Sequence, residues 1–509
     1  MRRRRWLALA VFGAVCVTVL LVAAFAAARP GGGSSYSGGS SRGGGGSRSS
    51  GGGGGGSGGG DGGAVLELLV WLCIEHPAIG IPLTIAFIAW VIWTRNRRGR
   101  QRDWNAGVAS PVYEARQAFP PYVPPPFTAT AKVDYDVLQA LDPKFSRVVF
   151  EDFLYGLYAE VQRARGLGQL NRLSAYLAPN TITALQQMTR GPVDNVIVGA
   201  VRLLEASATP VSGSRVVIEF ESNYTEAGQG QYVVERWTLA RGPNAKSRTP
   251  DKVRQLGCPN CGAPQDSLFS GSCRNCARIV NDGSFDWSVQ GVSVMERENR
   301  PPILTANVEE QGTNLPTVRD PDLPAALQRL RQKDPAFDVS QFNARVNLIF
   351  RQFQLGWSGR DLTKMRPFLS DALFTTQQYW VQEYLKQHLR NMTDGATVTN
   401  IELAKCVSDA FFDAITVRLS ATSLDYTIDD HGKVVSGSRS RQRAYTEYWT
   451  LIRGTNRKGP TKTDLGCSNC GAPLDVNMVG TCKFCNVKVT TGDFDWVLSR
   501  IEQDESYTG

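Results

Sequence analysis

The sequence predicts an α+β protein that carries two tandem copies of one domain, each with an inserted zinc ribbon, behind N-terminal transmembrane helices. Three observations lead to this prediction: a cysteine-rich segment occurs twice, apolar residues at helical spacing open each copy, and alternating apolar and polar residues follow. With 509 residues and 42% apolar content, the chain has room for two ordinary domains besides anchors and linkers.

The repeat is clearest around the cysteines. CPNCGAPQDSLFSGSCRNC at 258–276 returns as CSNCGAPLDVNMVGTCKFC at 467–485, and a Gly-x-Phe-Asp-Trp sequence follows each segment. Upstream, LNRLSAYL at 170–177 aligns with LTKMRPFL at 362–369 with a smaller shift. The second copy therefore has about 20 more residues in between, which we expect in its strands and loops.

Each copy is predicted to begin with helices and to continue as antiparallel strands. Residues spaced by three and four fall on one helical face, and residues spaced by two fall on one face of a strand. The predicted buried helical faces hold Phe150, Phe153, Leu154, Leu157 and Val161, and then Phe342, Val346, Ile349, Phe350 and Phe353. The predicted buried strand faces hold Val216, Ile218 and Phe220, and then Ile415, Val417 and Leu419, with the intervening residues facing water.

Eight of the eleven cysteines form two sets with metal-ligand spacing. Two CxxC turns joined by a short hairpin bring four thiolates around one tetrahedral Zn²⁺, and a closed four-thiolate site has no open position for catalysis. Gly262 and Gly471 follow the second ligand of each set, where positive φ turns backbone amides toward sulfur. The alternative, two disulfide pairs, requires an oxidising compartment. The predicted ligands of two structural zinc ions are Cys258, Cys261, Cys273 and Cys276, and Cys467, Cys470, Cys482 and Cys485.

Two apolar segments precede the repeat. Residues 1–28 are predicted to be a signal anchor or a cleavable signal peptide. The Gly/Ser-rich residues 29–63 are predicted to be a flexible linker. Residues 64–94 are predicted to contain a transmembrane segment, in which Glu75 and His76 are boundary residues or, alternatively, an intramembrane ion site.

The charge distribution orients the chain in the membrane. Residues 1–102 carry the entire excess of +9, whereas residues 103–509 hold 44 basic and 44 acidic side chains. The neutral folded part offers no bulk attraction to phosphate backbones, so nucleic acid is an expected partner only through ribosome contact. Because arginines flank both apolar segments, the positive-inside rule places the tandem domains on the cytoplasmic side.

The sequence DLTKMRPFLS before a helix, followed by three long strands with YTEYWTLIR, resembles the Tim44-like domain. The resemblance implies two cone-shaped domains of the nuclear-transport-factor-two-like type, in which helices pack on a curved antiparallel sheet. It also implies a tether that binds a protein partner at a lipid bilayer, in this case the plasma (inner) membrane of a bacterium. The resulting boundaries are 95–130 for a basic and then Pro-rich linker, 131–297 for the first Tim44-like domain, 298–335 for a linker and 336–503 for the second domain.

The predicted function is a membrane-anchored protein-binding adaptor, possible roles being protein transport or membrane-protein assembly, and not an enzyme. The alternatives are a ribosome- or RNA-contacting zinc-ribbon protein and a small-molecule hydrolase of the cone fold. A cavity in the cone would use Trp237, Trp449 and Tyr448 as wall residues, although filled-core roles are equally open for the tryptophans. Asp413 and Asp425, together with Tyr448, are the candidates for a hydrolase site, against ordinary roles as strand residues.

Overall fold

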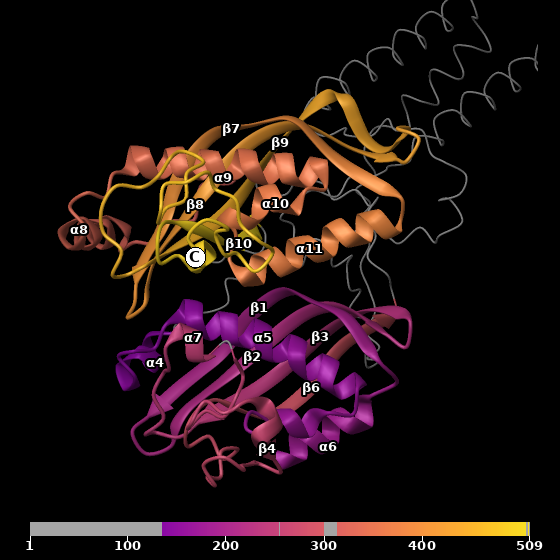
Figure 1. Ribbon diagram of the computed structural model, residues 1–509, viewed down its shortest axis with the longest axis vertical. Helices are drawn as coiled ribbons and strands as arrows, with labels where there is room; N and C mark the ends of the chain where they lie inside the picture. The colour runs from indigo at the N-terminus through magenta and orange to yellow at the C-terminus, as the bar shows by residue number, and fades with distance from the viewer. Residues whose placement is uncertain (1–134, 254, 300–312, 505–506, 508) are drawn as a thin grey trace, which may run out of the picture. The chain divides into compact units, whose positions relative to one another are not determined.

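The structure is a computed structural model that describes residues 135–253, 255–299, 313–504, 507 and 509. These residues form an α+β protein with two four-stranded antiparallel sheets and one two-stranded hairpin (Figure 1). The strand orders are β1-β2-β3-β6 in the first sheet and β10-β9-β8-β7 in the second. The predicted α+β class is confirmed.

The first sheet and its helices come from residues 136–299. The elements in chain order are α4 (Asp136–Leu141), α5 (Arg147–Gly166), η1 (Leu170–Leu173), α6 (Pro179–Met188), β1 (Val193–Thr209), β2 (Gly213–Glu226), β3 (Gln229–Arg241), α7 (Pro250–Val253), η2 (Gln265–Ser267), β4 (Leu268–Phe269), β5 (Ser272–Cys273) and β6 (Ser288–Asn299).

The second sheet and its helices come from residues 323–503. The elements are α8 (Leu323–Lys333), α9 (Val339–Gly359), α10 (Leu362–Met365), η3 (Arg366–Phe368), α11 (Asp371–Lys386), β7 (Leu389–Ser408), β8 (Phe412–Asp429), β9 (Val434–Gly454), η4 (Val489–Thr491) and β10 (Val497–Gln503). Helix α8 lies inside the segment 298–335, so the linker predicted there is too long. Pro324 stands in the first turn of α8, where a proline is tolerated because the N–H that it lacks would have no partner within the helix.

Helix α5 begins where Ser146 caps it and lies along the first sheet (Figure 1). The Ser146 hydroxyl accepts a hydrogen bond from the Val149 amide at 3.2 Å, which satisfies one of the free donors of the first turn. The predicted apolar face of this helix is buried throughout, with Leu154 and Leu157 fully inaccessible. The spacing of three and four therefore identified the correct face.

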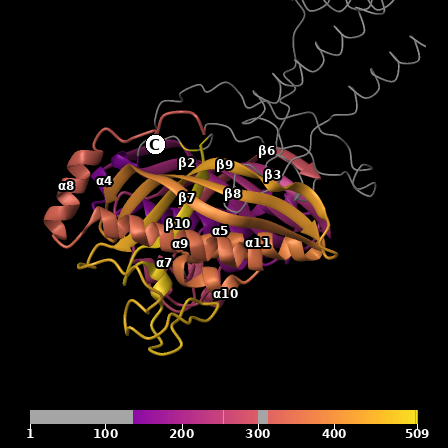
Figure 2. The ribbon, with the colours of Figure 1, turned by 90° about the horizontal axis from the view of Figure 1, so that it is seen from above.

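Helix α9 repeats this design in the second half. Asp338 caps it by accepting from the Gln341 amide at 2.8 Å, and Arg360 ends it in the left-handed conformation. All five predicted apolar residues of the helix are buried. Helices α9 and α11 run along the second sheet (Figures 1 and 2).

The sheets share one register around their central tryptophans. Ile218 on β2 stands opposite Trp237 on β3, and Val417 on β8 stands opposite Trp449 on β9. All four side chains are fully buried, so the inner strand faces are correctly predicted. Strands β7, β8 and β9 are longer than β1, β2 and β3, which confirms that the additional length of the second copy lies in its strands.

The outer strand faces differ from the prediction that they face water. Arg418 is only 6% exposed because its guanidinium pairs with Asp504 at 2.9 Å and donates to the Leu315 carbonyl at 2.6 Å. On the first sheet, Glu221 is 5% exposed and pairs with Arg202 at 2.9 Å. Alternation identifies the apolar face, but it gives no information about what covers the polar face.

Within the described residues, no helix combines the length and the apolar character that a membrane span requires. The segments predicted to enter the membrane, 1–28 and 64–94, lie outside the described residues, as do the linkers 29–63 and 95–130.

Candidate metal centres

Two clusters of four thiols stand out among the described residues. Each cluster brings its Sγ atoms within 4.8 Å of one another, and each combines two buried cysteines with one exposed and one half-buried cysteine. The members are the eight predicted ligands: Cys258, Cys261, Cys273 and Cys276, and Cys467, Cys470, Cys482 and Cys485. Both clusters can hold a metal ion.

The distances between sulfur atoms fit a tetrahedral site. Sγ atoms are 3.8 Å apart for Cys258 and Cys276, 3.8 Å for Cys261 and Cys273, and 3.9 Å in the second cluster for Cys467 and Cys485. Four sulfurs placed about 2.3 Å from a central ion form a tetrahedron with edges of about 3.8 Å. A disulfide would require about 2.05 Å, and all eight cysteines are free thiols.

Short turns position the first thiol pair of each cluster. Gly262 and Gly471 both have φ of +77°, as their place after the second cysteine predicts. The backbone amide of Ala263 then donates to the Cys261 sulfur, and the amide of Ala472 donates to the Cys470 sulfur. The glycines thus let the chain turn its amides toward the sulfur atoms.

The second thiol pair uses the same conformation without glycine. Ala277 and Asn486 follow the last cysteine of each cluster with φ of 54° and 57°. Alanine rarely adopts this region, so the residue type at position 277 does not indicate the turn, whereas asparagine adopts it more often than other non-glycine residues. Between the two pairs of the first cluster, β4 and β5 form the predicted hairpin, in which Leu268 pairs with Cys273.

Asparagine side chains support the more accessible thiols. Asn275 Nδ2 donates to Cys261 Sγ at 3.5 Å, and Asn260 Nδ2 donates to Cys276 Sγ at 3.4 Å. The hydrogen bond from Asn275 lowers the pKa of the Cys261 thiol to about 6, whereas burial raises the pKa of the Cys258 thiol to about 12. Metal binding must displace a proton from Cys258, so the metal affinity of this cluster falls with falling pH.

The first ribbon is part of the surrounding apolar core. Cys258, Cys273 and Leu268 belong to the same buried cluster as the residues of α5 and the first sheet. The Tyr176 hydroxyl also donates to the Gly257 carbonyl at 2.7 Å, directly before the first ligand. Loss of this ribbon would therefore expose residues of the main core.

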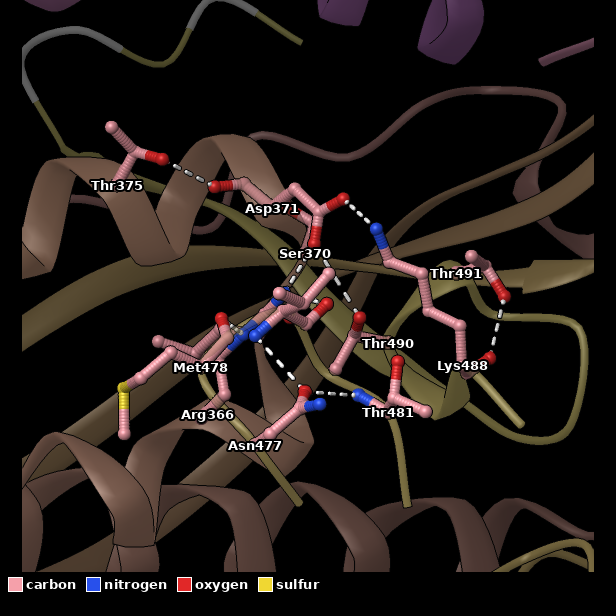
Figure 3. Close-up of polar contacts among 12 residues, drawn as sticks. Arg366, Ser370, Asp371, Thr375, Asn477, Met478, Thr481, Lys488, Thr490 and Thr491 are labelled. Atoms are coloured by element: carbon pink, nitrogen blue, oxygen red, sulfur yellow. Dashed lines mark hydrogen bonds and ion pairs between the residues drawn. The ribbon is translucent and has the colours of Figure 1, made fainter. Parts of the chain in front are cut away.

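The second ribbon has a small apolar core of its own. Figure 3 shows its polar attachment. Arg366, which is 2% exposed, donates through Nε to the Met478 carbonyl at 2.7 Å and through one terminal nitrogen to the Val479 carbonyl at 2.8 Å. Asp371 pairs with Arg366 and with Lys488 on the ribbon, both at 2.5 Å. We call these contacts the arginine clasp. Ser174 occupies the position of Arg366 in the first copy.

The residues proposed for a cavity wall lie in packed interiors. Trp237 contacts the rings of Tyr158 and Phe220 at centroid distances of 5.0 and 5.1 Å, and Trp449 packs on helix α9 in the same way. Tyr448 stacks on Tyr507 at 3.8 Å. This packing supports the filled-core alternative. A surface hollow of about 230 Å³ beside the arginine clasp is lined by other residues, among them Phe374 and Met478.

The candidates for a hydrolase site have structural partners. Asp413 pairs with Lys333 at 2.7 Å, Asp425 pairs with Arg443 at 3.1 Å, and the Tyr448 hydroxyl accepts from the Val318 amide at 2.9 Å. These contacts support their roles as ordinary strand residues.

A buried ion pair that no sequence pattern described above predicts occurs twice. Asp142 and Arg241 approach to 3.0 Å in the first half, and Asp334 and Arg453 approach to 3.0 Å in the second, with all four side chains at most 3% exposed. Each guanidinium lies 4.7 Å from the ring centre of the tryptophan in the Phe-Asp-Trp sequence. The available signal was the Asp-Pro-x-Phe sequence before each long helix.

The ion pair and its tryptophan join three parts of each half. The aspartate comes from the loop before the long helix, the arginine from the end of the third strand, and the tryptophan directly precedes the last strand. Burial acts to raise the pKa of Asp142, but hydrogen bonds from Ser247 and the charge of Arg241 outweigh it and leave the pKa below its ordinary value. The aspartate is thereby held ionised beside its arginine.

The fold and the clusters define a class of protein: an α+β protein with four-cysteine inserts that can hold a metal ion, placed between the last two strands of each four-stranded sheet. Residues 323–461 match the family model of the Tim44-like domain, so the second half of the chain carries a Tim44-like domain. The matched range ends before Cys467, which leaves the ribbon outside it. No curated protein matches the chain.

Proposed function

We propose that the chain is a membrane-anchored adaptor that binds a protein partner and is not an enzyme. The observation that carries this proposal is the Tim44-like domain at 323–461, because such domains are membrane-associated and belong to a non-catalytic adaptor family. Transport of proteins or assembly of membrane proteins is the proposed setting. We extend the cone-shaped fold to both halves, since they share the register around Trp237 and Trp449.

The proposed metal in both clusters is structural Zn²⁺. Four thiolates favour zinc over the harder cations, and a closed four-sulfur site stabilises a small fold that lacks a large core of its own. The separations of 3.8 and 3.9 Å between sulfurs support this choice. When bound, each ion supplies folding free energy, and the four cysteines of its cluster hold it without offering an open position.

The proposed location is the cytoplasmic side of a bacterial inner membrane. The arginine-flanked apolar segments 1–28 and 64–94 support this orientation. The free thiols are consistent with it, since a reducing compartment keeps cysteines available to a metal ion. The bilayer and a polypeptide are the proposed partners.

Photo-crosslinking of the full-length protein in its native membrane tests the adaptor role. A photoreactive residue at exposed Leu355 or Leu385 probes the Tim44-like domain, and the same residue at exposed Leu167 in the first half is the control. We expect one defined polypeptide to be captured from the Tim44-like positions, at a yield that nuclease treatment does not change.

Two other outcomes would replace the proposal. Capture of ribosomal RNA would favour the ribosome-contacting alternative, in which the ribbons make the contact. Turnover of a small ester or amide by the purified protein would favour the hydrolase alternative.

A further inference from the structure

The two metal clusters differ at one position that faces a ligand sulfur. Three of the four more accessible thiols accept a side-chain amide: Cys261 from Asn275, Cys276 from Asn260 and Cys485 from Asn469. The fourth is Cys470. Phe484 stands where Asn275 stands in the first cluster, and a phenyl ring has no donor to offer.

The corresponding thiols of the two clusters belong to the same classes of solvent exposure, so exposure does not account for this difference. Cys261 and Cys470 are both exposed, and Cys276 and Cys485 are both half-buried. Both exposed sulfurs also accept one backbone amide, from Ala263 and Ala472 respectively. The two exposed ligands therefore differ in their side-chain donor: Cys261 has Asn275, and Cys470 has Phe484 at the matching position.

Hydrogen bonds to a metal-bound thiolate withdraw electron density from sulfur and stabilise its charge. A thiolate that lacks such a bond keeps more electron density on its sulfur and is a stronger nucleophile toward oxidants and alkylating agents. Loss of one outer hydrogen bond at a metal site commonly changes metal affinity about 10- to 100-fold.

We propose that Cys470 is a modification site, at which hydroperoxides and soft electrophiles attack first and release the metal of the second cluster while the first cluster stays loaded. This inference rests on the proposed zinc occupancy of both clusters. It assigns a structural role to the first centre and a redox-sensitive role to the second.

The oxidation is balanced with a hydroperoxide as the oxidant. The Cys470 sulfur attacks one peroxide oxygen, the S–O bond forms, and the O–O bond breaks to leave an alcohol or water after protonation. A neighbouring thiolate of the cluster then attacks this sulfur and displaces hydroxide, which is protonated to water. Two thiolates become a disulfide, the peroxide gains two electrons and two protons, and the metal ion loses two of its ligands.

The geometry permits the second step within the cluster. All four sulfurs lie within 4.8 Å of one another, so a neighbouring thiolate needs to move by only about 2 to 3 Å to reach disulfide length. The arginine clasp holds the ribbon tip at Met478 and Val479 from outside the thiol cluster, so oxidation does not require the clasp to break.

The test uses purified full-length protein whose zinc content is first measured by mass spectrometry. Hydrogen peroxide or N-ethylmaleimide is added, zinc release is followed with a chromogenic chelator, and modified cysteines are mapped by peptide mass spectrometry. We expect two phases of one zinc ion each, with the faster phase about tenfold faster and accompanied by modification of Cys470.

Reciprocal substitutions assign the phases. Phe484→Asn should slow the fast phase about tenfold, and Asn275→Phe should accelerate release from the first cluster by a similar factor. Leu465→Asn, at an exposed apolar residue directly before the second ribbon, is the matched control and should leave both phases unchanged.

The possible outcomes distinguish a failure of the proposed zinc sites from a failure of the inference about Cys470. A chain that purifies without two zinc ions contradicts the proposed metal centres and the inference together. A chain with two zinc ions that releases them in one phase, loses the first centre earlier, or is unaffected by Phe484→Asn contradicts the inference alone.

Discussion

At the scale of single residues, the most constrained polar groups are buried charges that the two halves share. Arg241 and Arg453 are each enclosed between an aspartate and a tryptophan ring, where an unpaired charge is costly. Glu235 and Glu447 are each 1% exposed and accept a hydrogen bond at 2.9 Å from the tryptophan two residues later. These groups link the strands to their neighbours inside the core.

Removal of one partner from a buried pair should be strongly destabilising. Asp334→Ala leaves Arg453 buried without its counter-ion, and we expect a loss of about 3 to 5 kcal/mol in the free energy of unfolding. Asp322→Ala breaks the exposed pair with Arg329 and should cost less than about 1 kcal/mol. Urea denaturation of the two variants gives the comparison, and equal effects would show that the buried pair contributes nothing specific.

The buried Glu235 makes stability depend on pH. Burial raises the pKa of this carboxyl, so the folded protein holds the proton more tightly than the unfolded chain, in which the pKa is about 4.3. Its contribution is therefore favourable at low pH and is lost as the pH rises from the unfolded toward the folded pKa.

Glu235→Gln should remove this dependence, because glutamine keeps an oxygen acceptor for the Trp237 indole and does not ionise. We expect the variant to gain stability relative to the wild type as the pH rises through the acid range. Denaturation curves at several pH values measure the slope, with Glu205→Gln at an exposed position as the control. An unchanged slope would mean that Glu235 does not titrate in this range.

At the scale of elements, the two ribbons are attached by different forces. Apolar burial joins the first ribbon to its sheet and helices, whereas the arginine clasp holds the tip of the second (Figure 3). Within the second ribbon, the Asn477 side chain accepts from the Val479 and Thr481 amides at 3.1 and 3.0 Å and so shapes the tip that the clasp binds.

Arg366→Ala should release the tip of the second ribbon. The carbonyls of Met478 and Val479 lose their donor, and Asp371 loses one of its two cations. We expect faster hydrogen exchange for amides 476–482, while the strands of the sheet remain protected. Ser174→Ala at the matching position of the first copy should leave exchange in ribbon 258–276 nearly unchanged, and slow exchange in Arg366→Ala would contradict the clasp.

At the scale of the whole molecule, the same insert is integrated to different degrees in the two halves. Cys258 and Cys273 share a buried cluster with the main core, whereas Cys467 and Cys482 belong to a separate small cluster. Metal loss should therefore spread further from the first centre than from the second, because cooperative unfolding follows contiguous buried contacts.

Single ligand substitutions test this difference. Cys258→Ser and Cys467→Ser each remove one buried thiolate from a metal cluster. We expect a larger decrease in the thermal midpoint for Cys258→Ser, by several degrees, and an effect confined mainly to the ribbon for Cys467→Ser. Differential scanning calorimetry and hydrogen exchange measure the two effects, and the opposite order would contradict the division between an integrated and a separate ribbon.

The sequence by itself determined the α+β class, the apolar faces of α5 and α9, the inward residues of the strands and the eight cysteines that assemble into two clusters. These features are periodic or local: helices and strands repeat every 3.6 and 2 residues, and CxxC turns place their thiols over a few bonds. The left-handed conformation of Gly262 and Gly471 was predictable for the same reason, since it depends on the type of a single residue.

The tertiary structure alone decided what lies against the polar groups. Arg366 donates to the Met478 carbonyl and Arg453 pairs with Asp334, and each of these partners is more than 100 residues away in sequence. The groups that cover Arg418 are the Leu315 carbonyl and Asp504, which precede and follow the second sheet in sequence. The helix inside the predicted linker likewise forms because Leu330 finds a buried site. Such pairings depend on which distant segments meet, and no local pattern records that choice.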